Sequence, residues 1–123
     1  MILVIEDNFQ SRELLCDYLE VCGFSVVSAD DGKAGLEVAN QQLPDLIISD
    51  IDMPWMNGFQ VLEHLRHNPQ TAHIPFVVYT AASERHRKTL ATHLGANAYL
   101  TKPSDLSAIM QVINQQLQSR AAL

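Results

Sequence analysis

The stretch that most constrains the fold is LPDLIISDIDMPWMNG, residues 43–58, near the middle of the chain. Its apolar run, residues 46–48, is typical of a strand buried on both faces, and it ends abruptly at Ser49 and Asp50. Pro54, Asn57 and Gly58 then interrupt regular structure. A carboxylate at the carboxyl end of a buried strand lies where open α/β sheets keep their ligand crevice. Asp50 is therefore the first candidate for chemistry.

Four other apolar runs have the length of strands, at residues 2–5, 24–28, 74–79 and 98–100. Amphipathic patterns predict helices that begin near residues 8, 31, 59, 83 and 106. The helix expected at 83–94 has an apolar face only in its second half, so its first half should be weakly anchored. This alternation predicts an α/β fold, a doubly wound (βα)5 sandwich with a five-stranded parallel sheet and helices on both faces.

Three of these helices have inward stripes that the spacing of apolar residues defines. In the helix that begins near residue 59 the stripe is expected to contain Val61, Leu62 and Leu65. In the first helix the stripe is expected to contain Leu14, Leu15, Tyr18, Leu19 and Cys22. In the last helix it is expected to contain Leu106, Ile109, Met110, Ile113 and Leu117.

Composition narrows the class of protein further. The net charge of -6 argues against a nucleic-acid surface, because phosphates would be repelled. The basic run at residues 85–88 is interpreted as a solvated helix face. Cys16 and Cys22 lie on different faces of one helix, which excludes an easy disulfide and fits a reducing compartment. No leader or apolar run of about 20 residues is found, so we expect one cytoplasmic domain over residues 1–123, without a membrane span or output region.

Polar side chains follow four of the predicted strands. Glu6 and Asp7 follow the first, Asp50 the third, Thr80 the fourth and Lys102 the fifth. Because parallel strands share one carboxyl edge, these groups should converge there.

Three carboxylates at one edge would repel one another unless a cation is present. Oxygen ligands in an open site suit Mg2+, with Mn2+ as an alternative. Lys102 would add a fixed positive charge. A carboxylate beside a metal ion, an ammonium and a hydroxyl is arranged to attack phosphorus, so the expected product is an aspartyl phosphate on Asp50.

Several motifs, taken together, resemble the signature of bacterial two-component response-regulator receiver domains of the chemotaxis-regulator type. The motifs are Glu6-Asp7, Asp50 with Met53-Pro54 and Gly58, Thr80-Ala81, and Tyr99-Leu100-Thr101-Lys102-Pro103. Each is weak alone, but in this order, each at the end of a predicted strand, they are specific. The resemblance covers essentially the whole chain and implies the strand order 2-1-3-4-5.

The resemblance also implies roles for the site residues. Asp50 would take a phosphoryl group from a phosphohistidine on a sensor histidine kinase or phosphotransfer protein. Asp7, Asp50 and the main-chain carbonyl of Asp52 would hold the metal ion, while Glu6 would act mostly through water. Lys102 would contact Asp50 first and the phosphoryl oxygens afterwards. The domain would catalyse only its own phosphorylation and dephosphorylation.

A switch and its partners are implied in the same way. Thr80 would swing its hydroxyl onto the phosphoryl group, and Tyr99 would turn from exposed to buried. The bond between Lys102 and Pro103 would be cis. The phosphoryl donor would dock near the first helix, where Phe9 is a candidate contact. A homodimer partner or downstream target would bind the surface formed by the fourth helix, fifth strand and fifth helix.

Asp52 departs from the family pattern, which more often has a neutral or amide side chain there. We expect this extra carboxylate to tune the lifetime of the phosphoryl group. Asp50 and Asp52 also form the Asp-x-Asp pair of haloacid-dehalogenase-type phosphatases, which is an alternative function. A third reading is a receiver-like interaction module that is never phosphorylated. Trp55 and Met56 are either a partner contact or local packing.

Overall fold

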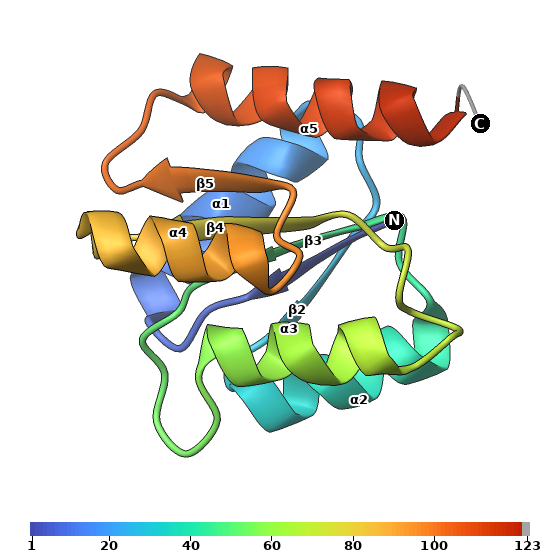
Figure 1. The fold of residues 1–123 in the computed structure, drawn as a ribbon. Coiled ribbons are helices and arrows are strands. Elements are labelled where there is room, and N and C mark those ends of the chain that lie inside the picture. Colours follow the sequence, from blue (N-terminus) through green and yellow to red (C-terminus); the bar gives the residue numbers. More distant parts are fainter. Residues whose placement is uncertain (122–123) are drawn as a thin grey trace.

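Five short strands and five helices alternate along the chain in a computed structural model that describes residues 1–121 (Figure 1). The elements are β1 (Ile2–Ile5), α1 (Phe9–Val21), β2 (Val26–Ala29), α2 (Gly32–Gln42), β3 (Leu46–Ser49), α3 (Gly58–His67), β4 (Phe76–Thr80), α4 (Arg85–His93), β5 (Ala98–Thr101) and α5 (Leu106–Ala121). The strands are parallel, in the order β2-β1-β3-β4-β5, which confirms the predicted fold. The last two residues of the expected domain, Ala122 and Leu123, lie outside the described residues.

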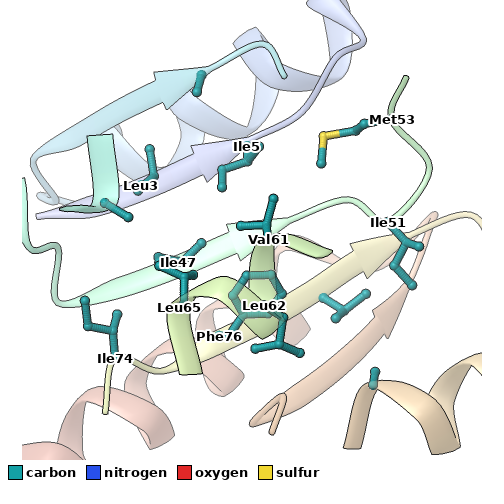
Figure 2. Packing of buried hydrophobic residues seen from close by; sticks show 14 residues of the cluster. Leu3, Ile5, Ile47, Ile51, Met53, Val61, Leu62, Leu65, Ile74 and Phe76 are labelled. Atoms are coloured by element: carbon teal, nitrogen blue, oxygen red, sulfur yellow. The ribbon is translucent and has the colours of Figure 1, made fainter. Parts of the chain in front are cut away.

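Helices cover both faces of the sheet, so the core has two layers. Side chains alternate between the faces of a strand: Leu3 and Ile5 point toward α2, α3 and α4, whereas Ile2 and Val4 point toward α1 and α5. Figure 2 shows the first layer, in which the strand residues face the buried side chains of α3. Because β1 and β3 are covered on both sides, β1 is apolar throughout and β3 is apolar up to its last residue, the buried Ser49. No helix within residues 1–121 is long and apolar enough to span a membrane.

The α3 helix is firmly held at its start and along one face. Val61, Leu62 and Leu65 are fully buried, as their spacing predicts. The Asn57 side chain accepts a hydrogen bond from the Gln60 amide at 3.0 Å, and the Gln60 side chain accepts one from the Asn57 amide at 2.9 Å. This capping box satisfies two of the amides that a helix start leaves free.

The α4 helix has far fewer anchors. Ala91 is its buried residue, and the N-cap residue Glu84 makes no side-chain hydrogen bond to the helix. The expected weak anchoring of its first half is confirmed.

The turn that follows α4 is held by Arg66, the penultimate residue of α3. Its guanidinium donates to the carbonyls of Ile74 at 2.8 Å and Gly95 at 2.9 Å, and to the side chain of Asn97 at 3.0 Å. The Asn97 side chain in turn accepts from the amide of Phe76 at 2.9 Å. One arginine therefore joins α3, the start of β4 and the turn between α4 and β5.

Three elements begin two residues later than the sequence predicts. β2 begins at Val26 and not at residue 24, because the amide of Phe24 still closes the end of α1 by donating to the Leu19 carbonyl at 3.1 Å. β4 begins after Pro75, which has no amide hydrogen for the ladder. α4 is Arg85–His93, shorter than the expected 83–94.

Two inward stripes were also predicted too broadly. In α1 the buried residues are Leu15, Cys16 and Leu19, whereas Leu14 is 67% exposed and Cys22 is exposed. Because the apolar residues of α1 extend around more of the helix than one face, their spacing alone did not fix which edge turns outward. In α5, Ile109 and Ile113 are buried as expected, but Leu106 is exposed. The two cysteines form no disulfide, as predicted.

Candidate functional site

The carboxyl edge of the sheet gathers three acidic side chains, as the sequence predicts. β1 and β3 are adjacent, with Ile5 opposite Ser49, so Glu6 and Asp50 leave the sheet at the same level. One carboxylate oxygen from each of Glu6, Asp7 and Asp50 lies within 4.8 Å of the others. Glu6 is buried, Asp50 is partly buried and Asp7 is exposed. Carboxylate oxygens at this spacing suit a hard divalent cation, so the cluster has the donor set of a metal site.

Lys102, which follows β5, places its ammonium group between two of these acids. Its Nζ forms an ion pair with Glu6 and lies 3.2 Å from Oδ2 of Asp50. The peptide bond between Lys102 and Pro103 is cis, as the resemblance implies. A partly buried cation thus neutralises part of the charge that the acidic cluster accumulates.

These contacts shift the pKa values of Glu6 and Lys102. Burial raises the pKa of Glu6 and the nearby Asp50 charge raises it further, against the opposing effect of Lys102. Burial alone would lower the pKa of Lys102, but its hydrogen bond to Glu6 and the charge of Asp50 outweigh this, so the pKa rises. Lys102 is therefore charged at neutral pH and oriented toward Asp50.

The two oxygens of Asp50 have different environments. Oδ1 accepts hydrogen bonds from the amides of Ile51 at 2.6 Å and Asp52 at 3.3 Å. Oδ2 faces Lys102. One oxygen is thus fixed by the backbone while the other is presented to the cation.

The loop after Asp50 closes tightly against the first residue of α3. The amide of Gly58 donates to the carbonyl of Ile51 at 2.9 Å. A Cβ at position 58 would collide with the main-chain carbonyl of Asp50, so only glycine fits there without movement. The start of α3 therefore sets the backbone position of Asp50.

Thr80 and Tyr99 meet at the loop between β4 and α4. The buried Thr80 hydroxyl accepts from the amide of Ala82 at 3.3 Å, and the Tyr99 hydroxyl donates to the carbonyl of the same residue. Tyr99 is partly buried, and burial raises the pKa of its phenol. Both side chains are therefore coupled to the segment that leads into α4.

Asp52 lies beside this site and pairs with a residue that the sequence did not single out. Its Oδ1 accepts a hydrogen bond from Nη1 of Arg87 on α4 at 2.8 Å. Within the basic run 85–88, Arg85, His86 and Lys88 are exposed, as the interpretation of a solvated face requires, whereas this pair leaves Arg87 only partly exposed. The pair joins positions 35 residues apart in sequence, and no local pattern signals it.

Arg12 is a second cation that sequence reasoning missed. Its Nη1 donates to the main-chain carbonyl of Glu6 at 2.8 Å, and its guanidinium lies 5.5 Å from the centre of the Phe9 ring. Arg12 thus ties α1 to the loop that carries Glu6. Its position one turn after the Asn8 cap is the only signal in the sequence that could have indicated this contact.

The family model of the response regulator receiver domain matches residues 2–114. The chain belongs to this family. Among its relatives, Protein PilH of Pseudomonas aeruginosa is 34% identical over 116 residues, which cover 94% of this chain and 96% of that protein. The probable chemotaxis protein CheY of Rhizobium etli is 37% identical over 113 residues, 91% of this chain and 88% of that protein.

Solved receiver structures agree with this assignment. A response regulator receiver domain protein from Clostridium thermocellum has a TM-score of 0.91 at 26% identity, covering 98% of this chain and 96% of that one. The chain is thus a receiver domain of two-component signalling and not a typical enzyme. These comparisons favour the receiver over the phosphatase alternative. Receiver domains interact with histidine kinases and with downstream targets.

Proposed function

We propose that Asp50 is the phosphoacceptor of this receiver domain and takes its phosphoryl group from a phosphohistidine on a sensor kinase or phosphotransfer protein. The observation that carries the proposal is the arrangement around Asp50. Two backbone amides fix one carboxylate oxygen, and Lys102 faces the other. A carboxylate whose two oxygens are held in this way is oriented for attack on phosphorus.

In the transfer, a carboxylate oxygen of Asp50 forms a bond to phosphorus as the bond from phosphorus to the donor nitrogen breaks. The electron pair of that broken bond stays on the donor imidazole. Lys102 moves with the developing charge from the carboxylate to the phosphoryl oxygens. Later attack by water on phosphorus returns free phosphate and the Asp50 carboxylate, so the domain ends its own signal.

A divalent cation, Mg2+ or Mn2+, fits the cluster of acids. Asp7, Asp50 and the main-chain carbonyl of Asp52 would hold it, with Glu6 acting through water. When bound, the ion neutralises charge on the carboxylates and the phosphoryl oxygens. Because a ligand that binds only the folded state stabilises it, Mg2+ at about 100 times its Kd should raise the free energy of unfolding by about 2.7 kcal/mol. Asp7→Asn should abolish most of that gain in urea titrations.

Phosphorylation of Asp50 would change the conformation of the domain through Thr80 and Tyr99. Thr80 would turn its hydroxyl to a phosphoryl oxygen, drawing the loop at Ala82 inward, and Tyr99 would follow that loop. The existing hydrogen bond between the Tyr99 hydroxyl and the Ala82 carbonyl supports this coupling. The weak anchoring of α4 supports a shift between states that already exist before phosphorylation.

The surface around α1 is the proposed docking site for the phosphoryl donor. Phe9 and Leu14 are large exposed apolar side chains on this helix. A hollow of about 240 Å³ lies between α1 and α5 and is lined by residues that include Leu14, Lys102 and Leu106. Exposed apolar side chains that border the site favour a protein donor.

Two further surfaces are candidate contacts. Trp55 is 92% exposed in the loop after Asp50, whereas its neighbour Met56 is partly buried and packs against the core, so Trp55 is the stronger candidate for a partner contact. The surface of α4, β5 and α5 is the proposed site for a second copy or a downstream target.

The direct test is labelling with phosphoramidate and Mg2+, followed by intact-mass spectrometry. We expect one phosphoryl group per wild-type chain and none on Asp50→Asn. Asp52→Asn is the matched control, because it removes a carboxylate two residues away; it should still be labelled, with changed rates of gain and loss of the phosphoryl group. Equal labelling of Asp50→Asn and the wild type would contradict the proposal.

A further inference from the structure

We propose that Arg87 is a positioning residue for the reaction at Asp50, because its pairing with Asp52 holds the first turn of α4 against the phosphoacceptor loop. This inference rests on the proposed function of Asp50. It assigns a role to a residue of α4 that contacts the phosphoacceptor only through another residue.

The contact is well defined on both sides. Nη1 of Arg87 lies 2.8 Å from Oδ1 of Asp52, and Nε of Arg87 lies 3.8 Å from a carboxylate oxygen of Glu84. The Arg87 side chain is 30% exposed and that of Asp52 is 61% exposed. Arg87 is thus turned from the solvent side of the helix toward the loop after β3.

Little else holds this end of α4. Glu84 supplies no side-chain hydrogen bond to the helix, and Ala91, near the other end, is the buried residue. Arg85, Arg87 and Lys88 place positive charge at a helix start, where the helix dipole already disfavours it. Pairing Arg87 with an acid relieves part of that repulsion and gives the first turn a tether.

Asp52 connects this tether to the reacting group. Its side chain binds Arg87, while its own backbone amide donates to Oδ1 of Asp50 at 3.3 Å. A change in the position of Arg87 is therefore transmitted to the backbone that orients the Asp50 carboxylate. Tyr99 belongs to the same set of contacts, since its hydroxyl binds Ala82 and its ring lies 5.7 Å from the ammonium of Lys88.

The pairing also resolves the charge problem that Asp52 creates. An unpaired carboxylate at this position would repel an incoming phosphoryl group, because both are negatively charged. The Arg87 guanidinium neutralises part of the negative charge of the Asp52 carboxylate. The departure of Asp52 from the family pattern and the cation on α4 are thus two parts of one arrangement.

The first test asks whether the tether exists, independently of phosphorylation. Hydrogen exchange by NMR would follow the amide of Lys88, which donates to the Glu84 carbonyl at 3.3 Å. Because partly exposed ion pairs contribute modestly, Asp52→Asn should raise exchange of this amide about 2- to 5-fold. Arg87→Gln should raise the exchange rate of the Lys88 amide in the same way. Arg85→Gln is the control, because it removes one positive charge from an exposed position on the same helix, and it should change this exchange rate little. Unchanged exchange in Asp52→Asn would refute the tether.

The second test asks whether the tether positions the reaction. Fluoroberyllate with Mg2+ is the probe, and we expect Arg87→Gln to weaken its binding about 2- to 5-fold. Arg87→Lys keeps the positive charge and should recover part of the lost fluoroberyllate affinity. The double variant Arg87→Gln/Asp52→Asn also removes the unpaired carboxylate, so it should recover the part of the loss that is caused by charge repulsion. Arg85→Gln should bind like the wild type.

The outcomes separate the two proposals. Faster exchange with unchanged fluoroberyllate affinity in Arg87→Gln would overturn the positioning role while leaving the function of Asp50 intact. Failure of the wild type to bind fluoroberyllate in Mg2+ would overturn the proposed function, and with it the role of Arg87 in the reaction. Exchange of the Lys88 amide would still decide whether the ion pair tethers α4.

Discussion

The helices α3 and α4 pack on the same face of the sheet, yet they are held in opposite ways. α3 has a capping box at its start and three fully buried side chains. α4 has no side-chain cap and one buried residue, and its first turn is linked to the phosphoacceptor loop through Arg87. α3 contacts the main-chain carbonyl of Asp50 through Gly58, whereas α4 is linked to Asp50 only through Asp52. The difference teaches that α3 fixes the backbone of the phosphoacceptor through packing, while α4 is linked to it by one ion pair that can be made or broken.

The largest expected effect comes from the buried face of α3. Leu62→Ala should lower the free energy of unfolding by about 2–5 kcal/mol, because it leaves a cavity in the core. Leu90→Ala is the same substitution at an exposed position of α4, and it should cost less than about 1 kcal/mol. Urea denaturation measures both. Equal losses would break the comparison between the two helices.

The second effect concerns the first residue of each helix. Gly58→Ala should cost about 1–3 kcal/mol, because the added Cβ meets the Asp50 carbonyl and forces backbone movement. Phosphoramidate labelling should slow in the same variant, since Asp50 shifts. Arg85→Ala changes the first residue of α4 and should alter stability by no more than about 0.5 kcal/mol. A harmless Gly58→Ala would show that α3 does not set the position of Asp50.

A third prediction concerns the side-chain cap at the start of α3, which has no counterpart in α4. Asn57→Ala should cost about 1 kcal/mol, since the Gln60 amide loses its acceptor at the start of α3. Urea denaturation gives the value, and Glu84→Ala at the uncapped start of α4 is the control, expected to change little. A loss at Glu84 as large as that at Asn57 would mean that the two helix starts are equally stabilised.

The smallest expected effect comes from adding a side-chain cap to the start of α4. Glu84→Asp keeps the charge and supplies a side chain suited to the N-cap position, so it should stabilise the helix by about 0.5 kcal/mol. Slower hydrogen exchange of the Lys88 amide would report the gain. Exchange as fast as in the wild type would indicate that capping does not limit the order of this turn.

The sequence predicted most of what local pattern controls. Apolar runs located the strands, and the spacing of Val61, Leu62 and Leu65 correctly gave the buried face of α3. Because parallel strands end at one edge, the gathering of Glu6, Asp7 and Asp50 followed from their positions after the strands.

What the sequence did not predict depends on contacts between distant segments. Arg87 pairs with Asp52 only because the fold brings α4 beside the loop after β3. Leu14 and Cys16 are both apolar, and packing against the sheet, not spacing, decides which is buried. The clamp made by Arg66 joins three segments and leaves no local pattern in the chain.

That clamp gives α4 the geometry of a lever. Arg66 holds the turn at Gly95 just beyond the helix, so this end serves as the pivot. The helix has nine residues and, at 1.5 Å per residue, is about 13 Å long, so a tilt of about 10° would carry its first turn through about 2 Å. A displacement of that size is comparable to the difference between a hydrogen bond made and one broken. A small rotation about Arg66 is therefore enough to engage or release the contact at Asp52.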